Sequence, residues 1–295
     1  MNRSRPAFTL IELLVAIGVI GLLISFLLVA VQGAREAAAR VACQNNLRQI
    51  GLGLHAYHDR TGQLPPQPIR NGLYDPNSTL SWMGLILPDV DQAGLWAATT
   101  RAYAVDRIPF RNPPHVGYNT VVKLYLCSAD GRLGSPLTDS FGVTAAYASY
   151  LGVLGSTSND GVLGPEPGIR LADITDGTSA TLMVGERPPP DSLQGGHWYT
   201  ATRHSVWGPN RGPDEKMPVL GQVSITDDEC TGAVVEFGYG RTGNPCDRYH
   251  FWSLHVGGAN FLFADGGVRF LRFGTRDILP ALASRAGGEV VAVPD

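Results

Sequence analysis

Residues 8–31 read FTLIELLVAIGVIGLLISFLLVAV, and Glu12 is the only ionisable side chain among them. As an α-helix with a rise of about 1.5 Å per residue, this stretch spans about 36 Å, enough to cross the hydrocarbon core of a bilayer. The stretch therefore predicts a membrane-spanning helix near the N-terminus. No second stretch of this kind follows in the sequence.

Arg3 and Arg5 precede this apolar stretch. By the positive-inside rule they place the N-terminus in the cytoplasm, so that everything after Gln32 is exported. We expect a single-pass inner-membrane protein whose C-terminal domain is periplasmic or at the cell surface. A secretory signal peptide would have an apolar region of only about 7–15 residues. An ordinary stop-transfer anchor would have no use for Glu12, because an acid inside a span costs about 3 kcal/mol.

The composition excludes several classes of protein. The 295 residues are 44% hydrophobic and include 36 Gly and 21 Pro, which fits neither a disordered tail protein nor a collagen-like repeat. The net charge of -3 gives no electrostatic footprint for a polyanion. We therefore expect a folded protein with no nucleic-acid partner.

Residues 7–15, AFTLIELLV, resemble the N-terminus of type IV prepilins, in which a glycine normally precedes FTLIE. The resemblance implies that residues 1–7 are a cytoplasmic leader. A prepilin peptidase/methyltransferase would cut between Ala7 and Phe8 and methylate the new Phe8 amine. Ala7 stands where the family usually has Gly. Glu12 then becomes the fifth residue of the mature chain, as in the family.

The carboxylate of Glu12 and the new amine of Phe8 would lie about 6 Å apart along the helix axis. Each is costly to bury alone, but the two are tolerable as a pair. In pilin-like filaments, the family implies, Glu12 of one subunit meets the amine of the next, which would favour one axial stagger. Pairing within one chain would specify no assembly, and the sequence leaves both arrangements open.

Residues 32–62 are expected to continue the helix outside the membrane as an amphipathic half. One apolar stripe recurs at spacings of four, three, four and three residues, which is typical of one helix face: Cys43, Leu47, Ile50, Leu54 and Tyr57. We expect this stripe to face a globular domain. Gly62 and the pair Pro65-Pro66 then end the helix, so that residues 8–59 would form one helix about 78 Å long.

Residues 63–295 change character, with frequent Gly, Pro, Asn and Asp between short apolar runs, and we expect a globular β-rich domain. The predicted fold is α+β and pilin-like: the long N-terminal helix packs on a mainly antiparallel sheet with long loops. Residues 186–232 are expected to contain a long insertion. The candidate strands are residues 121–126, 146–151, 181–185, 233–237, 259–263 and 268–273.

Four more segments, in order, resemble the uncharacterised prepilin-like bacterial family named for its H-X9-DG motif. The motif itself is His255, nine residues, then Asp265-Gly266. The other segments are residues 43–51 (CQNNLRQIG), 57–59 (YHD) and 173–186, the last running from DITDGTS to GE. Val29 stands where pilins favour Pro, so we expect no helix break there.

The named motif invites a catalytic or metal-binding interpretation in which His255 and Asp265 act together. If residues 259–263 form a strand, the nearly extended chain places the two side chains about 30 Å apart. We therefore favour a structural role, with Asp265-Gly266 as a hairpin turn. A sharp bend at Gly257-Gly258 is the alternative that would bring them together.

Other metal candidates are weaker, and we predict no metal, no cofactor and no enzymatic activity. His55 and His58 lie three residues apart with no third ligand indicated, and Asp173 and Asp176 are better explained as a turn and a cap. One acidic set remains as a calcium candidate by analogy with secretion pseudopilins: Asp227, Asp228, Glu229 and Asp247.

The exported part contains four cysteines, where oxidation to disulfides is allowed. Three full pairings can form. We favour Cys43 with Cys127, because Cys43 belongs to the stripe that faces the domain, and Cys230 with Cys246, which closes a loop of about 15 residues. Four buried or free thiols are the alternative.

Taken together, the sequence predicts a membrane-anchored pilin-like or pseudopilin subunit of a type II secretion or type IV pilus-like filament, with other pilin-like subunits as partners. The alternative is a monomeric membrane-tethered module that binds carbohydrate. That module would present aromatic side chains for sugar stacking, of which Trp198, Tyr199 and Trp207 are the candidates.

Overall fold

The computed structural model describes residues 9–66, 80–139, 142–156, 160–163, 168–193, 195–200, 230, 236–289 and 291–293. The expected cleavage site between Ala7 and Phe8, the residues before it, and most of the expected insertion lie outside these described residues.

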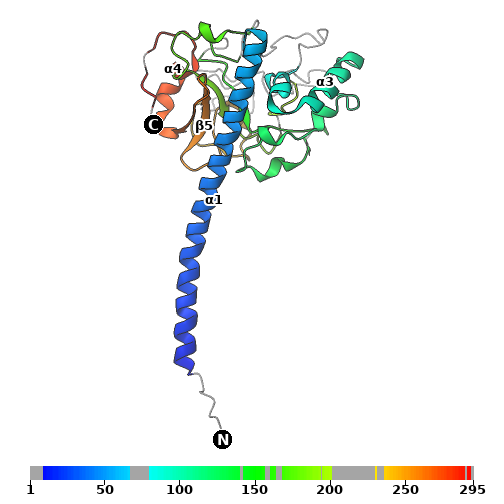
Figure 1. Cartoon of the computed structure of the whole chain (residues 1–295). Coiled ribbons are helices and arrows are strands. Elements are labelled where there is room, and N and C mark those ends of the chain that lie inside the picture. Colours follow the sequence, from blue (N-terminus) through cyan, green and yellow to red (C-terminus); the bar gives the residue numbers. More distant parts are fainter. Residues whose placement is uncertain are drawn as a thin grey trace.

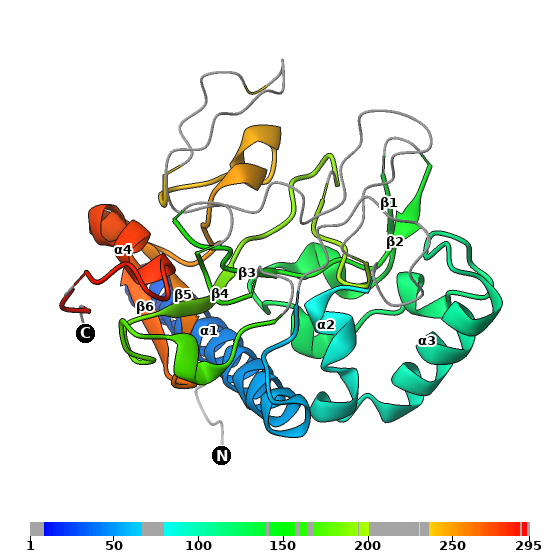
Figure 2. The ribbon, with the colours of Figure 1, turned by 90° about the horizontal axis from the view of Figure 1, so that it is seen from above.

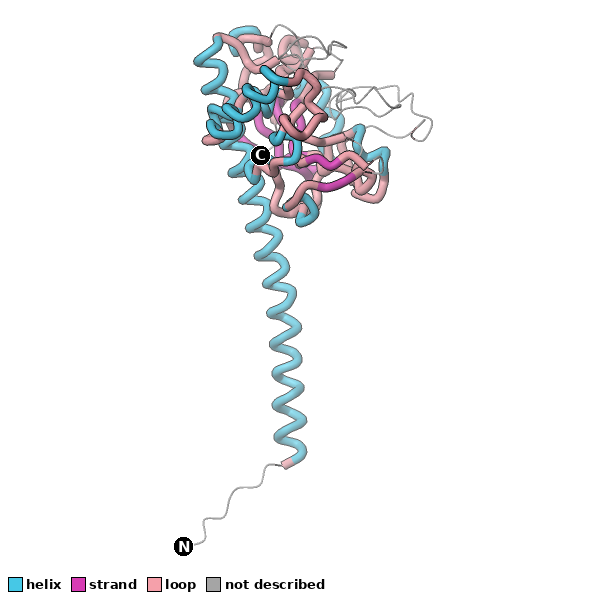
Figure 3. The backbone as a smooth tube through the Cα atoms, turned by 90° about the vertical axis from the view of Figure 1, so that its right-hand side faces the viewer, coloured by secondary structure: helices cyan, strands magenta, loops and turns pink. Residues whose placement is uncertain are grey.

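A single long helix, α1 (Leu10–Thr61), dominates the shape of the molecule. Its first half projects as a bare stalk, and its second half runs along a compact head (Figures 1 and 3). The helix is continuous through Val29, as predicted. It ends at Gly62, whose φ of 80° is readily adopted only by glycine and whose N–H donates to the carbonyl of His58.

The predicted stripe on α1 is buried against the head. Cys43, Leu47, Ile50 and Leu54 have no exposed surface, and Tyr57 packs against the same core while partly buried. Glycine lets the helix approach the sheet closely, since a Cβ at Gly51 would lie 2.8 Å from a side-chain carbon of Leu262. The 3.6-residue periodicity therefore correctly located the face that holds the head.

The head contains a four-stranded antiparallel sheet in the order β3-β4-β5-β6, which confirms the α+β class. The strands are β3 (Tyr150–Gly152), β4 (Leu182–Glu186), β5 (Gly258–Phe263) and β6 (Val268–Arg272). The last three match the runs expected near residues 181, 259 and 268. Tyr150 lies opposite Glu186 in the register, so the end of β4 is fixed beside the start of β3.

The two faces of the sheet are covered by different elements. On one face Leu262 packs in the cluster that includes the stripe of α1. On the other face Phe261 and Phe263 pack with the short helix α4 (Leu279–Ala283). Figure 2 shows α1 and α4 on either side of β4 to β6. Both faces are therefore buried, and all six residues of β5 are buried.

A second lobe of the head lies beside α1, on the side away from strands β5 and β6 (Figure 2). It contains α2 (Trp82–Leu85), α3 (Ala93–Val105) and the hairpin of β1 (Leu137–Thr138) and β2 (Thr144–Ala145). Seven short 3-10 helices connect the described parts of the head: η1 (Leu87–Val90), η2 (Val116–Asn119), η3 (Lys123–Tyr125), η4 (Gly131–Gly134), η5 (Leu171–Asp173), η6 (Pro245–Tyr249) and η7 (Phe273–Ile278).

Several predicted strands were wrong or shortened. Residues 121–126 contain the 3-10 helix η3 instead of a strand, because Val122 and Tyr125, three residues apart, are buried rather than alternate residues. The run from 146 to 151 enters the sheet only at Tyr150. Of residues 233–237, the first three lie outside the described residues, and Glu236 and Phe237 are not in a strand. Helix α3 was not predicted.

Candidate functional site

Glu12 lies in the first turn of α1, where its carboxylate completes a capping box with Thr9. Its Oε2 accepts hydrogen bonds from the Thr9 N–H at 2.9 Å and from the Thr9 hydroxyl at 2.8 Å, while the Glu12 N–H donates to that hydroxyl at 3.3 Å. The chain thus satisfies this acid locally. Glu12 is also exposed, so its carboxylate remains accessible to another group.

The half of α1 that carries Glu12 is uncovered. Large apolar side chains from Leu10 to Val29 are each more than half exposed. Among the described residues, α1 is the one helix long and apolar enough to cross a membrane, and none of its most apolar window is buried. The described part of the chain therefore has one N-terminal apolar helix, which is consistent with a membrane anchor.

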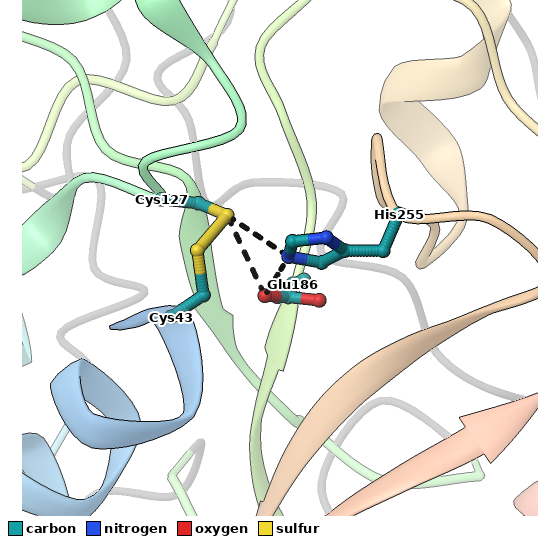
Figure 4. A group of neighbouring side chains, drawn as sticks. All are labelled: Cys43, Cys127, Glu186 and His255. Carbon is teal, nitrogen blue, oxygen red and sulfur yellow. Dashed lines mark hydrogen bonds and ion pairs between the residues drawn. A yellow bond between two sulfur atoms is a disulfide. The ribbon is translucent and has the colours of Figure 1, made fainter. Parts of the chain in front are cut away.

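The second feature is a buried cluster in the head, where α1 meets the end of β4 and the loop before β5 (Figure 4). Its members are Cys43 from α1, Cys127 from the segment after η3, Glu186 at the end of β4, and His255. All four are at least 96% buried. One potential ligand atom from each lies within 4.8 Å of those of the others.

Two disulfides are present, Cys43–Cys127 and Cys230–Cys246, and both are the pairs favoured from the sequence. The first joins α1 to the head across 84 residues of sequence, with a Cα–Cα distance of 5.0 Å. The second closes a separation of 16 residues. The Cys43–Cys127 bridge therefore fixes the helix to the domain that it supports.

His255 lies between two carboxylates. Its Nδ1 is 3.0 Å from Oε1 of Glu36 on α1, and its Nε2 is 3.5 Å from Oε1 of Glu186. Burial disfavours the imidazolium, but hydrogen bonds and charge from Glu186 and Glu36 more than offset this and raise the pKa of His255. Nε2 also lies 3.3 Å from Sγ of Cys127, so the ring faces the disulfide (Figure 4).

Glu186 is a buried carboxylate, only 1% exposed, and both of its oxygens have hydrogen-bond donors. Its Oε2 accepts from the backbone N–H of Asn260 at 2.7 Å, and its Oε1 accepts from the Asn260 side chain at 3.0 Å. The carbonyl oxygen of that side chain accepts from Gln44 on α1 at 3.0 Å. This cluster thus brings together three separate motif segments. Cys43 begins the first, Glu186 ends the second, and His255 begins the third.

Asp265 and Gly266 are elsewhere, in the turn between β5 and β6. Gly266 has a φ of 84° and donates to the carbonyl of Phe263 at 3.0 Å, while the Asp265 carboxylate accepts from the N–H of Gly267 at 2.8 Å. Strand β5 separates this turn from His255. The two ends of the H-X9-DG motif therefore have different partners, and the histidine contacts Glu36 and Glu186 instead.

The weaker metal candidates have structural partners. Asp173 pairs with Arg170 at 2.6 Å, and Asp176 accepts from the N–H groups of Gly287 and Gly288. Asp247 in η6 accepts from Arg241 and Asn244, which precede this helix, and pairs with His250, which follows it. The other three members of the acidic set, Asp227, Asp228 and Glu229, lie outside the described residues.

His55 and His58, the remaining pair, lie on the part of α1 that contacts the head. The Nε2 of His58 accepts from the backbone N–H of Leu171 at 3.3 Å. The Nε2 of His55 is buried near the turn at Gly266. The two rings therefore lie against different parts of the head.

The aromatic residues proposed as a ligand surface are in the core. Trp198 is 1% exposed and Tyr199 is fully buried, so neither can stack on a sugar, and that assignment was wrong. Trp198 donates from its indole to the carbonyl of Thr120, which places it between loops. Trp207 lies outside the described residues.

Two sequence families match the chain. The one described as "Protein of unknown function (DUF1559)" matches residues 32–273, which is most of the protein. The chain belongs to this family. The "Prokaryotic N-terminal methylation motif" matches residues 2–28, over the start of α1. No curated protein and no solved structure matches. The protein is thus a pilin-like member of the DUF1559 family with a prepilin-type N-terminus and a membrane-anchoring helix.

Sequence reasoning alone missed Glu36 and the role of Glu186. Glu36 is 219 residues from His255 in sequence, and no local pattern marks the two as neighbours. A signal did exist, since Glu186 ends one of the family segments and His255 begins another. What the sequence does not contain is the packing of α1 against the end of β4, which brings these residues together.

Proposed function

We propose that this DUF1559 protein is a structural subunit that is cut after Ala7, methylated on Phe8, and assembled with other pilin-like subunits into a type II secretion or type IV pilus-like filament. A prepilin peptidase/methyltransferase is the processing partner. The N-terminus is cytoplasmic and the head is exported. The chain has an architectural role in this proposal and carries out no chemistry.

The observation that carries the proposal is the uncovered half of α1, which bears one carboxylate near its start. A lone anchor needs only apolar side chains, because lipid is its sole neighbour. Glu12 is costly in that setting unless a cation meets it. The amine created at Phe8 is a cation at the right end of the helix, and among the described residues Thr9 is the group that donates to the Glu12 carboxylate.

The test separates assembly from capping. Glu12→Gln removes the charge but keeps an oxygen that can accept from Thr9, whereas Thr9→Val removes the hydroxyl and keeps the charge. We expect Glu12→Gln to insert, fold and be cleaved, yet to disappear from sedimentable, cross-linkable polymers. Thr9→Val should still assemble. Intact mass of each extracted protein, shortened by seven residues and heavier by one methyl group, shows that processing took place.

Three outcomes contradict the proposal. Unchanged polymer formation by Glu12→Gln would mean that the carboxylate is not needed for assembly, leaving a tethered extracytoplasmic domain. An intact Met1 in the membrane-extracted protein would remove the processing step itself. Loss of assembly in Thr9→Val with normal assembly in Glu12→Gln would instead assign the motif to helix capping.

One specific observation favours the ligand-binding alternative. Tyr239 is 80% exposed, and its ring lies 4.5 Å from that of Phe273, beside the side chains of Arg276 and Asp277 in an open depression. An exposed aromatic face flanked by charged hydrogen-bonding groups suits sugar stacking. Affinity electrophoresis in soluble polysaccharides tests this: retardation that Tyr239→Ala abolishes supports a carbohydrate module, and equal mobility of both proteins excludes it.

A further inference from the structure

We propose that the cluster of Cys43, Cys127, Glu186 and His255 is a redox-gated zinc site, closed when the disulfide is formed and able to bind one Zn²⁺ when the two cysteines are reduced. This inference is independent of filament assembly. It concerns the part of the head that Figure 4 shows. The donor set, two thiolates, one imidazole and one carboxylate, consists of groups that bind zinc in proteins.

The distances already match a tetrahedral site. With Zn–S of about 2.3 Å and Zn–N or Zn–O of about 2.0–2.1 Å, the edges between ligand atoms are about 3.3–3.8 Å. In the structure, Nε2 of His255 lies 3.3 Å from Sγ of Cys127 and 3.5 Å from Oε1 of Glu186, and that oxygen lies 3.7 Å from the same sulfur. Three edges of the tetrahedron therefore exist before any metal binds.

The fourth corner is Cys43. Its sulfur lies within the same 4.8 Å group, and its bond to Cys127 is the edge that must lengthen to about 3.8 Å after reduction. The backbone N–H of Ser128 donates to this sulfur at 3.1 Å. Such a donor stabilises a thiolate more than a neutral thiol, so the surroundings of Cys43 suit a metal-bound sulfur.

The groups around the four ligands are those that a zinc site needs. Nδ1 of His255 is 3.0 Å from Glu36, which leaves Nε2 directed at the other ligands. A carboxylate on the far nitrogen of a ligating histidine fixes the ring and raises its basicity. Glu186 is likewise held by Asn260 at 2.7 and 3.0 Å. The side chain of Glu36 is 39% exposed, so the outer side of the cluster borders solvent.

The chemistry balances with a dithiol as reductant. The dithiol gives two electrons and two protons and becomes a disulfide, while the Cys43–Cys127 bond breaks to two thiols. Zn²⁺ then binds as both thiol protons and the Nε2 proton of His255 leave to solvent, and the Nδ1 proton remains directed at Glu36. A disulfide as oxidant reverses the sequence: it takes two electrons and two protons and becomes a dithiol, the Cys43–Cys127 bond re-forms, and the ion is released because a disulfide sulfur has no thiolate charge to offer.

The experiment uses the full chain in detergent with Cys230→Ser and Cys246→Ser, so that one pair of cysteines remains. A trialkylphosphine reduces that pair, taking oxygen from water to form the phosphine oxide, and is then removed. Co²⁺ is added first and Zn²⁺ second. We expect one Co²⁺ per reduced chain with thiolate-to-metal absorption and the visible bands of tetrahedral cobalt, displaced by equimolar Zn²⁺, and no such spectrum from the oxidised chain.

Variants assign the ligands. His255→Ala and Glu186→Gln should each weaken Co²⁺ binding by more than 100-fold, and Glu36→Gln, which orients the histidine, by about 10- to 100-fold. His115→Gln, at a buried histidine outside the cluster, is the matched control and should bind as the parent does. X-ray absorption of the zinc-loaded parent, which needs no variant to fold, should give two sulfur and two nitrogen or oxygen ligands.

Several results overturn the inference. The reduced chain could show no tetrahedral cobalt spectrum, or the oxidised chain could give the same one. Undiminished binding by both His255→Ala and Glu186→Gln would show that two thiolates alone hold the ion. A zinc shell with four sulfurs would place the metal between two chains rather than in this cluster.

Discussion

Removing the Cys43–Cys127 disulfide should destabilise the head more than removing Cys230–Cys246. The two bridges close sequence separations of 84 and 16 residues. In the chain-entropy model these loops correspond to about 4.5 and about 3 kcal/mol of stability at 25 °C. A loss of about 4.5 kcal/mol is a large fraction of the 5–15 kcal/mol that is typical of a domain.

Burial increases the contrast. Cys43 is fully buried and Cys127 is 4% exposed, so Ala at both positions also leaves small voids in the main core. Cys230 and Cys246 form a small separate cluster with Tyr249. The double variant Cys43→Ala/Cys127→Ala should therefore lose at least 1.5 kcal/mol more, as an order-of-magnitude difference, than Cys230→Ala/Cys246→Ala.

Urea unfolding of the full chain in detergent measures this difference. Trp82, Trp198 and Trp252 are each about 1% exposed, so tryptophan fluorescence reports the unfolding of the head. The oxidised parent is the common reference, and each double variant is compared with it under nonreducing conditions. Equal losses for the two variants, or a larger loss for Cys230→Ala/Cys246→Ala, would refute the reasoning from loop length and burial.

Three further predictions follow from single contacts. Burial lowers the pKa of His115, so below about pH 6.5 the unfolded chain binds a proton more readily than the folded chain does. The free energy of unfolding should therefore decrease as the pH drops through about 6.5. Thermal melts at several pH values should show a weaker pH dependence for His115→Gln than for the parent. Gly51→Val should cost about 1–3 kcal/mol by overpacking against β5, whereas Gly33→Val, with nothing within 4 Å, should leave the melting temperature of the head unchanged. Asp176→Ala should free the segment after Ser284, seen as faster proteolysis there with an unchanged core.

Periodicity predicted the parts of the fold that depend on one element and its own face. The stripe from Cys43 to Tyr57 needed only the 3.6-residue repeat, and β5 and β6 needed only the alternation around the Asp265-Gly266 turn. Helix α3 was not predicted because its sequence has weak helix-start signals. Gln92 makes no side-chain cap, and Gly94 lies in the first turn. Tertiary burial of Tyr125 similarly overrode the strand-like run that contains it.

Periodicity could not predict which residues surround His255. Alternation along β5 indicates which side chains share a face, but it does not indicate which distant segment covers that face. The sequence therefore allowed us to separate His255 from Asp265, yet gave no route to Glu36 or Glu186. Their meeting depends on how α1 crosses the end of β4, which is set by the packing of the whole stripe against the sheet.

The position of this cluster relates the head to the stalk. Cys43 is the first fully buried residue of the stripe and marks where α1 enters the head. Glu36 lies about two helical turns before it and contacts His255. Two links act at this point, the disulfide to Cys127 and the contact of Glu36 with His255. Two links about two turns apart on one helix restrain both its rotation about its own axis and its sliding relative to the head. If exposed halves of α1 pack together in a filament, these links determine which face each head presents to its neighbours, and this is a physical reason for placing family-motif residues here rather than at the surface.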